Sequence, residues 1–296
     1  MAEVTLTAAL RTNLLSLQRT QGLLDITQNR LATGKKVNSA LDDANAFFAS
    51  QSLNNRASDL ERLLDGIGQG VQTLKAADQG ISSLTKLVEQ AQSIAQTARD
   101  LAGSIVDETP DADLESQRTE LQQLETDFRG IMTQIDELAR DSGYRGTNLL
   151  NGANLTIQFN ENDTAQLEIS GITFDAEGLG FEADPTDYSF YTLDGANYDL
   201  DQTMEDIQAA LDDAKGALNS LRSQARTFGG NMATIQVREE FTKGLINTLK
   251  EGSDKLTLAD INEEGAKLLS LQTAQQLGIT SLALASQAQQ SVLRLF

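Results

Sequence analysis

Both ends of the chain carry apolar residues at helical spacing. A leucine recurs every seven residues from Leu10 to Leu31, and residues 265–296 keep a comparable three-and-four spacing. Residues three and four positions apart lie on one face of a helix, so each end predicts one helix with a continuous apolar seam. We expect the two seams to pack against each other. The seam residues are Leu10, Leu14, Leu17, Leu24, Leu31, Leu268, Leu271, Leu282, Val292 and Phe296.

The faces opposite the two seams are nearly uncharged. Residues 265–296 contain no acid and two cations, and residues 4–24 contain two arginines and no acid. A helix on a soluble surface normally carries charges opposite its seam, whereas these helices carry Gln, Ser and Thr. The pattern therefore predicts protein neighbours on several sides of each helix. The alternative is a pair of ordinary amphipathic helices at the edge of one soluble bundle.

Glutamines interrupt both seams, among them Gln21 and Gln275. Amide side chains satisfy each other without charge, and a polar residue in a seam specifies register at some cost in stability. We hypothesise that these glutamines fix the register of the packed ends. At any single position, a glutamine that only faces solvent is the alternative.

Three longer helical patterns fill most of the middle of the chain. Near-3.5 spacing from Leu53 to Ala98 predicts a helix of about sixty residues, with Asp42 and Asp43 before it as capping residues. A second seam runs from Leu114 to Leu138 after a loop in which Pro110 suits the first helical position. The third pattern runs from near residue 200 to near residue 255. The terminal helices are bounded by the Gly-Lys-Lys break at residues 34–36 and by Asp260, which is placed to cap the last helix.

A β-like region separates the second and third of these helices. Residues 155–159 and 166–170 alternate as strands do and predict a hairpin, and residues 172–174 and 188–193 predict further short strands. The predicted fold class is mainly α: an elongated antiparallel helical bundle or coiled coil formed by both chain ends, with a small central insertion that contains the hairpin. The expected domains are a terminal helical pair (1–36 with 260–296), a long-helix rod (37–150 with 198–259) and an outward-facing β-rich insertion (151–197).

Composition limits the chemistry open to this chain. It has no Cys and no His, which excludes disulfides, thiol nucleophiles and imidazole acid–base catalysis. The formal net charge of −20 is concentrated in the middle of the chain, and this acidic surface argues against nucleic acid as a partner. No apolar run approaches the roughly twenty residues that span a bilayer. The start of the chain lacks the basic and apolar segments of a cleaved signal peptide, so we expect none.

An enzyme and a coiled-coil scaffold are the alternatives from other classes. The carboxylates are scattered along helix faces, and no phosphate loop, nucleophile elbow or metal-ligand spacing occurs. The adjacent pairs Asp42-Asp43 and Glu263-Glu264 point apart on a helix. We therefore predict no catalytic, cofactor-binding or metal-binding residues. A scaffold or receptor is disfavoured by the missing membrane segment and by the small β insertion.

Motifs at both ends resemble those of the flagellin family. At the N-terminal end the resemblance rests on Thr12-Asn13, on the stretch from Leu31 to Ala40, and on Asp42-Asp43-Ala44. At the C-terminal end it rests on Ala259-Asp260-Ile261, Glu263-Glu264, the Gln-rich run after Leu271, Ala288-Gln289-Gln290, and the stretch from Val292 to Leu295. The turn at residues 148–152 resembles the family's entry into its β region. The resemblance spans essentially the whole chain, as a short form with a small central insertion.

The resemblance implies a function. Flagellins are structural subunits that leave the cell through the channel of the flagellum without a cleaved signal and polymerise at its tip into the extracellular filament. Their terminal helices form an inner tube through which the subunits assemble, so the ten seam residues above are the expected assembly interface. The implied partners are further copies of the chain, the export apparatus, an export chaperone and the filament cap. The hook–filament junction protein, which has similar ends, is the alternative.

One stretch departs from the family pattern. Many flagellins carry an arginine-rich motif in the first long helix that a host toll-like receptor recognises, and residues 84–96 of this chain contain no arginine. We expect weak or absent recognition by that receptor. We also expect the terminal helices to order on polymerisation, because one seam buries too little apolar surface to offset the entropy lost on ordering both ends.

Overall fold

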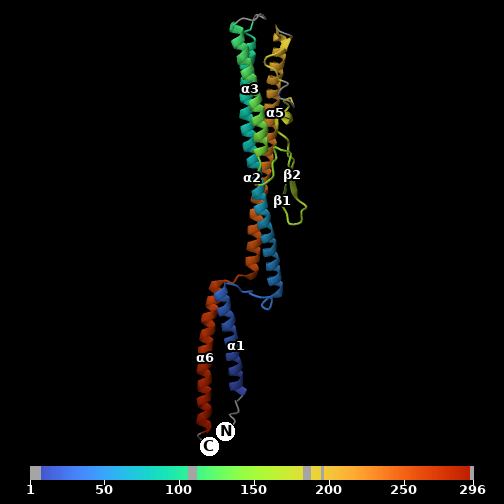
Figure 1. The fold of residues 1–296 in the computed structure, drawn as a ribbon. Helices are drawn as coiled ribbons and strands as arrows, with labels where there is room; N and C mark the ends of the chain where they lie inside the picture. Colours follow the sequence, from blue (N-terminus) through green and yellow to red (C-terminus); the bar gives the residue numbers. More distant parts are fainter. Residues whose placement is uncertain (1–7, 106–111, 183–187, 195–196, 294–296) are drawn as a thin grey trace. The chain divides into compact units, whose positions relative to one another are not determined.

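The computed structural model describes residues 8–105, 112–182, 188–194 and 197–293 (Figure 1). The chain divides into two compact units. The terminal unit contains Met1–Ser58 and Leu245–Phe296, and the central unit contains Asp59–Gly244. The helices are α1 (Ala8–Thr33), α2 (Ala44–Ala102), α3 (Ala112–Asp141), α4 (Ala176–Leu179), α5 (Leu200–Thr257) and α6 (Ile261–Leu293). The strands are β1 (Leu155–Gln158), β2 (Gln166–Ile169), β3 (Leu193–Asp194) and β4 (Asn197–Tyr198).

The helix boundaries of the terminal unit follow from capping residues that the sequence predicted. Helix α1 ends where Gly34 adopts a φ of +68°, a conformation that favours glycine. Asp43 precedes α2, and its Oδ1 accepts a hydrogen bond from the backbone N–H of Ala46 at 3.0 Å. Asp260 precedes α6, and its Oδ1 accepts from the N–H groups of Asn262 and Glu263 at 2.9 and 3.2 Å. These side chains satisfy donors that have no partner within their helices.

The two linkers of the terminal unit are joined by backbone hydrogen bonds. The N–H groups of Lys36 and Val37 donate to the carbonyl of Thr257 at 2.8 and 3.3 Å, and the N–H of Ala259 donates to the carbonyl of Gly34 at 2.9 Å. Lys35 and Leu258 form an isolated antiparallel bridge. The segment that leaves α1 is therefore fixed to the segment that enters α6, although the two lie far apart in the sequence.

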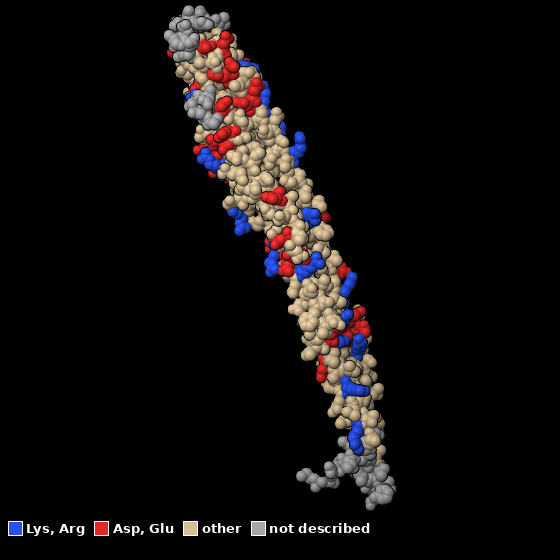
Figure 2. Space-filling view, turned by 90° about the vertical axis from the view of Figure 1, so that its right-hand side faces the viewer, with Lys and Arg blue, Asp and Glu red and all other residues tan. Residues whose placement is uncertain are grey.

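In the central unit, α2, α3 and α5 share one hydrophobic core. The predicted seams supply it: Leu84 and Val88 of α2, Phe128 of α3, and Leu221 and Phe228 of α5 are fully or almost fully buried. Acidic side chains gather on the face seen in Figure 2 at the end of this unit where α3 and α5 begin in Figure 1. The seam periodicity of the three long patterns therefore predicted the core correctly.

The hairpin of β1 and β2 has the predicted position and an antiparallel register that pairs Leu155 with Ile169. Ile157 and Ile169 are buried on one face, whereas the polar residues that alternate with them are exposed. Ile157 lies directly over Gly70 of α2, where a Cβ would come within 2.8 Å of its Cγ1. The guanidinium of Arg238 on α5 lies 5.5 Å from the ring centroid of Phe159, just after β1. The hairpin thus contacts both α2 and α5.

The sequence predicted two further strands, of which the first is wrong and the second is only partly right. Residues 172–174 form only an isolated bridge, between Thr173 and Asn151, because Asp175 caps the short helix α4 directly afterwards. Of residues 188–193, only the last lies in a strand. Their backbone is satisfied by α3 side chains instead: Phe190 N–H donates to Glu125, and Arg129 donates to the carbonyl of Tyr188. Pro110 lies outside the described residues.

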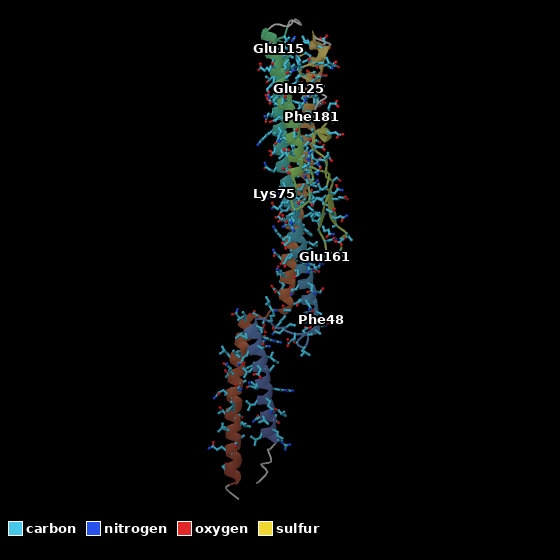
Figure 3. All side chains as sticks on the ribbon, in the orientation of Figure 1. Phe48, Lys75, Glu115, Glu125, Glu161 and Phe181 are labelled. Atoms are coloured by element: carbon cyan, nitrogen blue, oxygen red, sulfur yellow. The ribbon has the colours of Figure 1, made fainter. Side chains whose placement is uncertain are left out.

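An aromatic cluster attaches the segment after α4 to α3 and α5. The ring centroids of Phe181 and Tyr188 lie 6.3 and 5.4 Å from that of Phe128 on α3 (Figure 3). The hydroxyl of Tyr188 donates to Asp213 Oδ2 on α5 at 2.6 Å and accepts from the N–H of Glu182 at 2.8 Å. Burial, together with the carboxylate of Asp213, holds the pKa of Tyr188 well above its ordinary value.

Candidate assembly interface

Helices α1 and α6 lie side by side in the terminal unit (Figure 1) and meet along the predicted seams. Leu10 and Leu24 of α1 are buried, with 6% and 3% of their surface exposed. The remaining seam leucines that the structure describes are half-buried, except Leu14, which is 39% exposed. The half-buried ones are Leu17, Leu31, Leu268, Leu271 and Leu282. The side chain of Val292 and the whole of Phe296 lie outside the described residues.

The two helices approach each other closely at a glycine. A Cβ on Gly278 of α6 would lie 2.9 Å from Cδ2 of Leu17, a distance that Cβ contacts do not reach without movement. One turn away, Gln275 Nε2 donates to Gln21 Oε1 at 2.6 Å. These two contacts place a size restriction and an amide hydrogen bond next to each other. Both contacts depend on the present register of α1 against α6, and the role of the seam glutamines in setting it stays a prediction.

Near the start of α6 an acidic side chain is buried between two cations. Glu264 Oε1 lies 3.3 Å from Arg30 Nη1 of α1 and 3.3 Å from Lys267 Nζ, and only 6% of the glutamate side chain is exposed. Lys267 also pairs with Glu263 at 2.7 Å. Hydrogen bonds to Glu263, and then to Glu264, raise the pKa of Lys267. Both carboxylates lie in the first turn of α6, where the helix dipole favours negative charge.

The other oxygen of this carboxylate is unsatisfied. Within the part of the chain that the structure describes, the buried Oε2 of Glu264 accepts no hydrogen bond. Glu264 is one of the residues that line a groove of about 400 Å³ between α1 and α6. Because buried polar atoms normally have a partner, this unpaired oxygen is an exception.

Large apolar side chains remain exposed on the faces of α1 and α6 outside the seam. On α6, Leu269 and Leu277 are 67% and 66% exposed, and no acidic residue follows Glu264. Contiguous exposed apolar surface is typical of a face that contacts another protein. The exposed large apolar residues of the two helices, apart from Leu14, are Leu15, Leu23, Ile26, Ile261, Leu269, Leu277, Ile279 and Leu284.

Sequence reasoning predicted uncharged outer faces but did not select these residues. It chose the best-spaced leucines, which the structure places largely within the α1–α6 pair. The signal that would have found the others is their position: they are leucines and isoleucines that fall off the seam on a helix without acids. Two further exposed residues, Leu41 in the linker and Phe48 near the start of α2, are 98% and 59% exposed (Figure 3).

The described part of the chain shows no group of side chains arranged to hold a metal ion. None of its described helices combines the length and hydropathy needed to cross a bilayer. The most developed feature of the terminal unit is therefore the helical pair with its exposed apolar faces.

Comparison with known proteins gives matches at both ends of the chain. Residues 4–155 match the bacterial flagellin N-terminal helical region, and residues 211–296 match the bacterial flagellin C-terminal helical region. The first match alone covers more than half of the chain. It contains α1 and α2, and the second contains α6.

Individual relatives extend the similarity over the whole length. The flagellin of Brucella melitensis biotype 1 is 28% identical over 300 residues, which cover 100% of this chain and 99% of the relative. Flagellin FljK of Caulobacter vibrioides is 27% identical over 281 residues, which cover 95% of this chain and 93% of the relative. The crystal structure of Bacillus cereus flagellin covers 61% of this chain with a TM-score of 0.42 and 14% identity, and 88% of that structure is matched.

The resemblance that the sequence motifs indicated at the two ends is confirmed by these matches, which include both terminal helices and the long helix between them. The chain belongs to the bacterial flagellin family.

Proposed function

We propose that this chain polymerises into the bacterial flagellar filament through the exposed faces of α1 and α6. Its family establishes a structural filament subunit rather than an enzyme, with the filament outside the cell. The proposed mode of assembly is supported by the α1–α6 pair. This pair buries one seam and leaves large apolar side chains such as Leu269 and Leu277 exposed.

Burial of those side chains supplies the driving force. Moving an exposed leucine or isoleucine fully out of water contributes about 1.5–3 kcal/mol, and several such residues lie on the two helices. The outer faces carry few charges, so packing against other copies does not bury unpaired charged side chains. The surface of the central unit is acidic at the end where α3 and α5 begin (Figures 1 and 2), which suits a surface that stays in water.

The finer points of the proposal follow the family resemblance. The terminal pair (1–36 with 260–296) forms the inner part of the filament, the long-helix segments (37–150 with 198–259) the surrounding part, and residues 151–197 face outward. The chain is exported unfolded through the flagellar channel without a cleaved signal. An export chaperone and the filament cap assist it. The ten seam residues act by holding α1 and α6 together, so that the faces outside the seam contact the neighbouring copies.

Seeded polymerisation tests this proposal. Purified full-length chain, added to sonicated filament seeds, is expected to form long filaments visible by negative-stain electron microscopy. A chain without residues 265–296 should form none, because it lacks most of α6 and its exposed leucines. Far-ultraviolet circular dichroism and urea unfolding of the truncated chain control for the central unit, which should stay folded. Filaments from the truncated chain, or none from the full chain under any seeding condition, would contradict the proposal.

A further inference from the structure

The groove at the start of α6 has three features that point to an occupant. It holds about 400 Å³, it is lined by both α1 and α6, and one of its lining residues, Glu264, has a buried carboxylate oxygen, Oε2, without a hydrogen-bond partner among the described residues. The glutamate side chain is 6% exposed, so water has little access to this oxygen. A buried acceptor left in this state costs free energy that an incoming donor would recover.

The electrostatics of the groove select a neutral donor. Glu264 and Glu263 are balanced by Arg30 and Lys267, which pair with them at 2.7–3.3 Å. A further cation would bring charge to a site that is already neutral, and an anion would be repelled by the carboxylate. A side-chain amide or hydroxyl satisfies the oxygen without changing the charge balance.

Part of the groove wall on α1 is apolar. Leu23 and Ile26 line it and are 52% and 49% exposed, so they form a half-covered apolar edge beside the carboxylate. The groove therefore fits a surface that presents a large apolar side chain next to an amide or hydroxyl. The two together are typical of an uncharged helix face.

This chain carries such a face itself. Between residues 268 and 288, the polar residues of α6 are all Gln, Ser or Thr, and they lie among the exposed Leu269, Leu277 and Leu284. We propose that the groove beside Glu264 receives this face of α6 from a second copy, which donates a hydrogen bond to Glu264 Oε2. The inference rests on the proposed polymerisation and names one specific contact within it. The groove and the inserted face lie at different places on the same chain, which allows the contact to repeat head-to-tail in an open polymer.

Two pairs of variants test the contact by seeded elongation. Glu264→Gln keeps the size of the side chain but presents an amide donor where the acceptor is needed. Glu251→Gln, the control, removes the same charge from an exposed ion pair with Lys255 on α5, outside the groove. Ile26→Gln makes the groove edge polar, and Ile172→Gln makes the same change at a half-exposed site in the central unit. We expect Glu264→Gln and Ile26→Gln each to raise the critical concentration about tenfold or more, and both controls to elongate as the wild type does.

The outcomes separate the inference from the proposed function. A wild-type chain that does not elongate seeds would refute the proposed function itself. A wild-type chain that elongates, with Glu264→Gln equal to Glu251→Gln, would overturn the inference. If Glu264→Gln lowers the helix content of the monomer, Ile26→Gln decides, since Ile26 is exposed. In that case normal elongation by Ile26→Gln overturns the inference. A filament map that places any segment other than α6 in the groove would overturn it as well.

Discussion

Leu17 of α1 lies so close to Gly278 of α6 that a Cβ on the glycine would stand 2.9 Å from the leucine Cδ2. The hydrogen bond between Gln275 and Gln21 follows one turn away at 2.6 Å. A side chain at position 278 requires the Leu17 side chain to move or the helices to separate or slide, and sliding would break the amide pair. The glycine therefore controls both the spacing and the register of the terminal helices.

Gly278→Ala is expected to destabilise the α1–α6 pair by about 1–3 kcal/mol, the usual cost of overpacking. Urea unfolding of seeded filaments, followed by circular dichroism, measures the loss. Gly265→Ala is the matched control, because nothing lies within 4 Å of a Cβ at that position of the same helix. It should be neutral or stabilising by up to about 1 kcal/mol, since alanine favours helix over glycine. Equal stability of the two variants would show that the close contact does not restrict the pair.

Asp260→Ala is expected to fray the start of α6. The Asp260 carboxylate accepts hydrogen bonds from the N–H groups of Asn262 and Glu263, and loss of an N-cap costs about 0.5–2 kcal/mol. The measurement is amide exchange of residues 261–264 in the assembled filament, which should become faster. Asp254→Ala, an exposed site inside α5, controls for the loss of charge. Unchanged exchange in Asp260→Ala would contradict the capping role.

Tyr188→Phe is expected to destabilise the central unit by about 1–3 kcal/mol. The change removes the hydrogen bond to Asp213 Oδ2 and the one from Glu182, one of which involves a charged partner. Equilibrium urea unfolding measures the change. Tyr144→Phe removes a half-exposed tyrosine hydroxyl that donates to Gln69 at 3.1 Å, so it should cost less. A smaller effect at Tyr188 than at Tyr144 would contradict the assignment of this hydroxyl as a buried link.

The same tyrosine predicts a loss of stability in alkaline solution. Burial raises the pKa of Tyr188 above its ordinary value of 10.0, so the folded chain holds this proton more tightly than the unfolded chain does. The stabilisation is fully present below about pH 10 and decreases as the pH rises above it. Urea unfolding between pH 9 and 11.5 should therefore show a smaller decrease for Tyr188→Phe than for the wild type. Parallel decreases in both proteins would contradict this prediction.

Periodicity and capping chemistry in the sequence predicted the helices well because both are local. The seams gave α1, α2, α3, α5 and α6, and Asp43 and Asp260 cap helices as expected. The strand expected at residues 188–193 failed for a tertiary reason: Glu125 and Arg129 of α3 satisfy its backbone in place of a neighbouring strand.

The candidate assembly interface was predictable in part, because its seam is also a local pattern. The seam leucines were readable from their spacing, and the absence of acids predicted that the outer faces meet protein. The groove beside Glu264 was not readable, because it depends on Arg30 of α1 meeting the first turn of α6, more than two hundred residues later. The sequence alone also gave no sign of the backbone bonds between Gly34 and Ala259 that bring those turns together.

Amide exchange of the free and the polymerised chain provides the last prediction. In the monomer, α1 and α6 bury one shared seam, and residues such as Leu277 and Leu284 are more than half exposed, whereas the core of the central unit is fully enclosed. One seam offsets only part of the conformational entropy lost on ordering two long helices. We therefore expect amides of α1 and α6 to exchange much faster than those of the buried core of α3 in the monomer.

In the filament, exchange from the terminal helices should slow by several orders of magnitude, because their outer faces are then buried, while exchange from α3 should change little. Hydrogen–deuterium exchange read by mass spectrometry on both forms measures this. The core of α3 around Phe128 and Ile135, fully buried in the structure, is the internal control. If the terminal helices of the monomer are already protected as strongly as α3, the α1–α6 pair is stable alone. Assembly would then not be needed to order these helices.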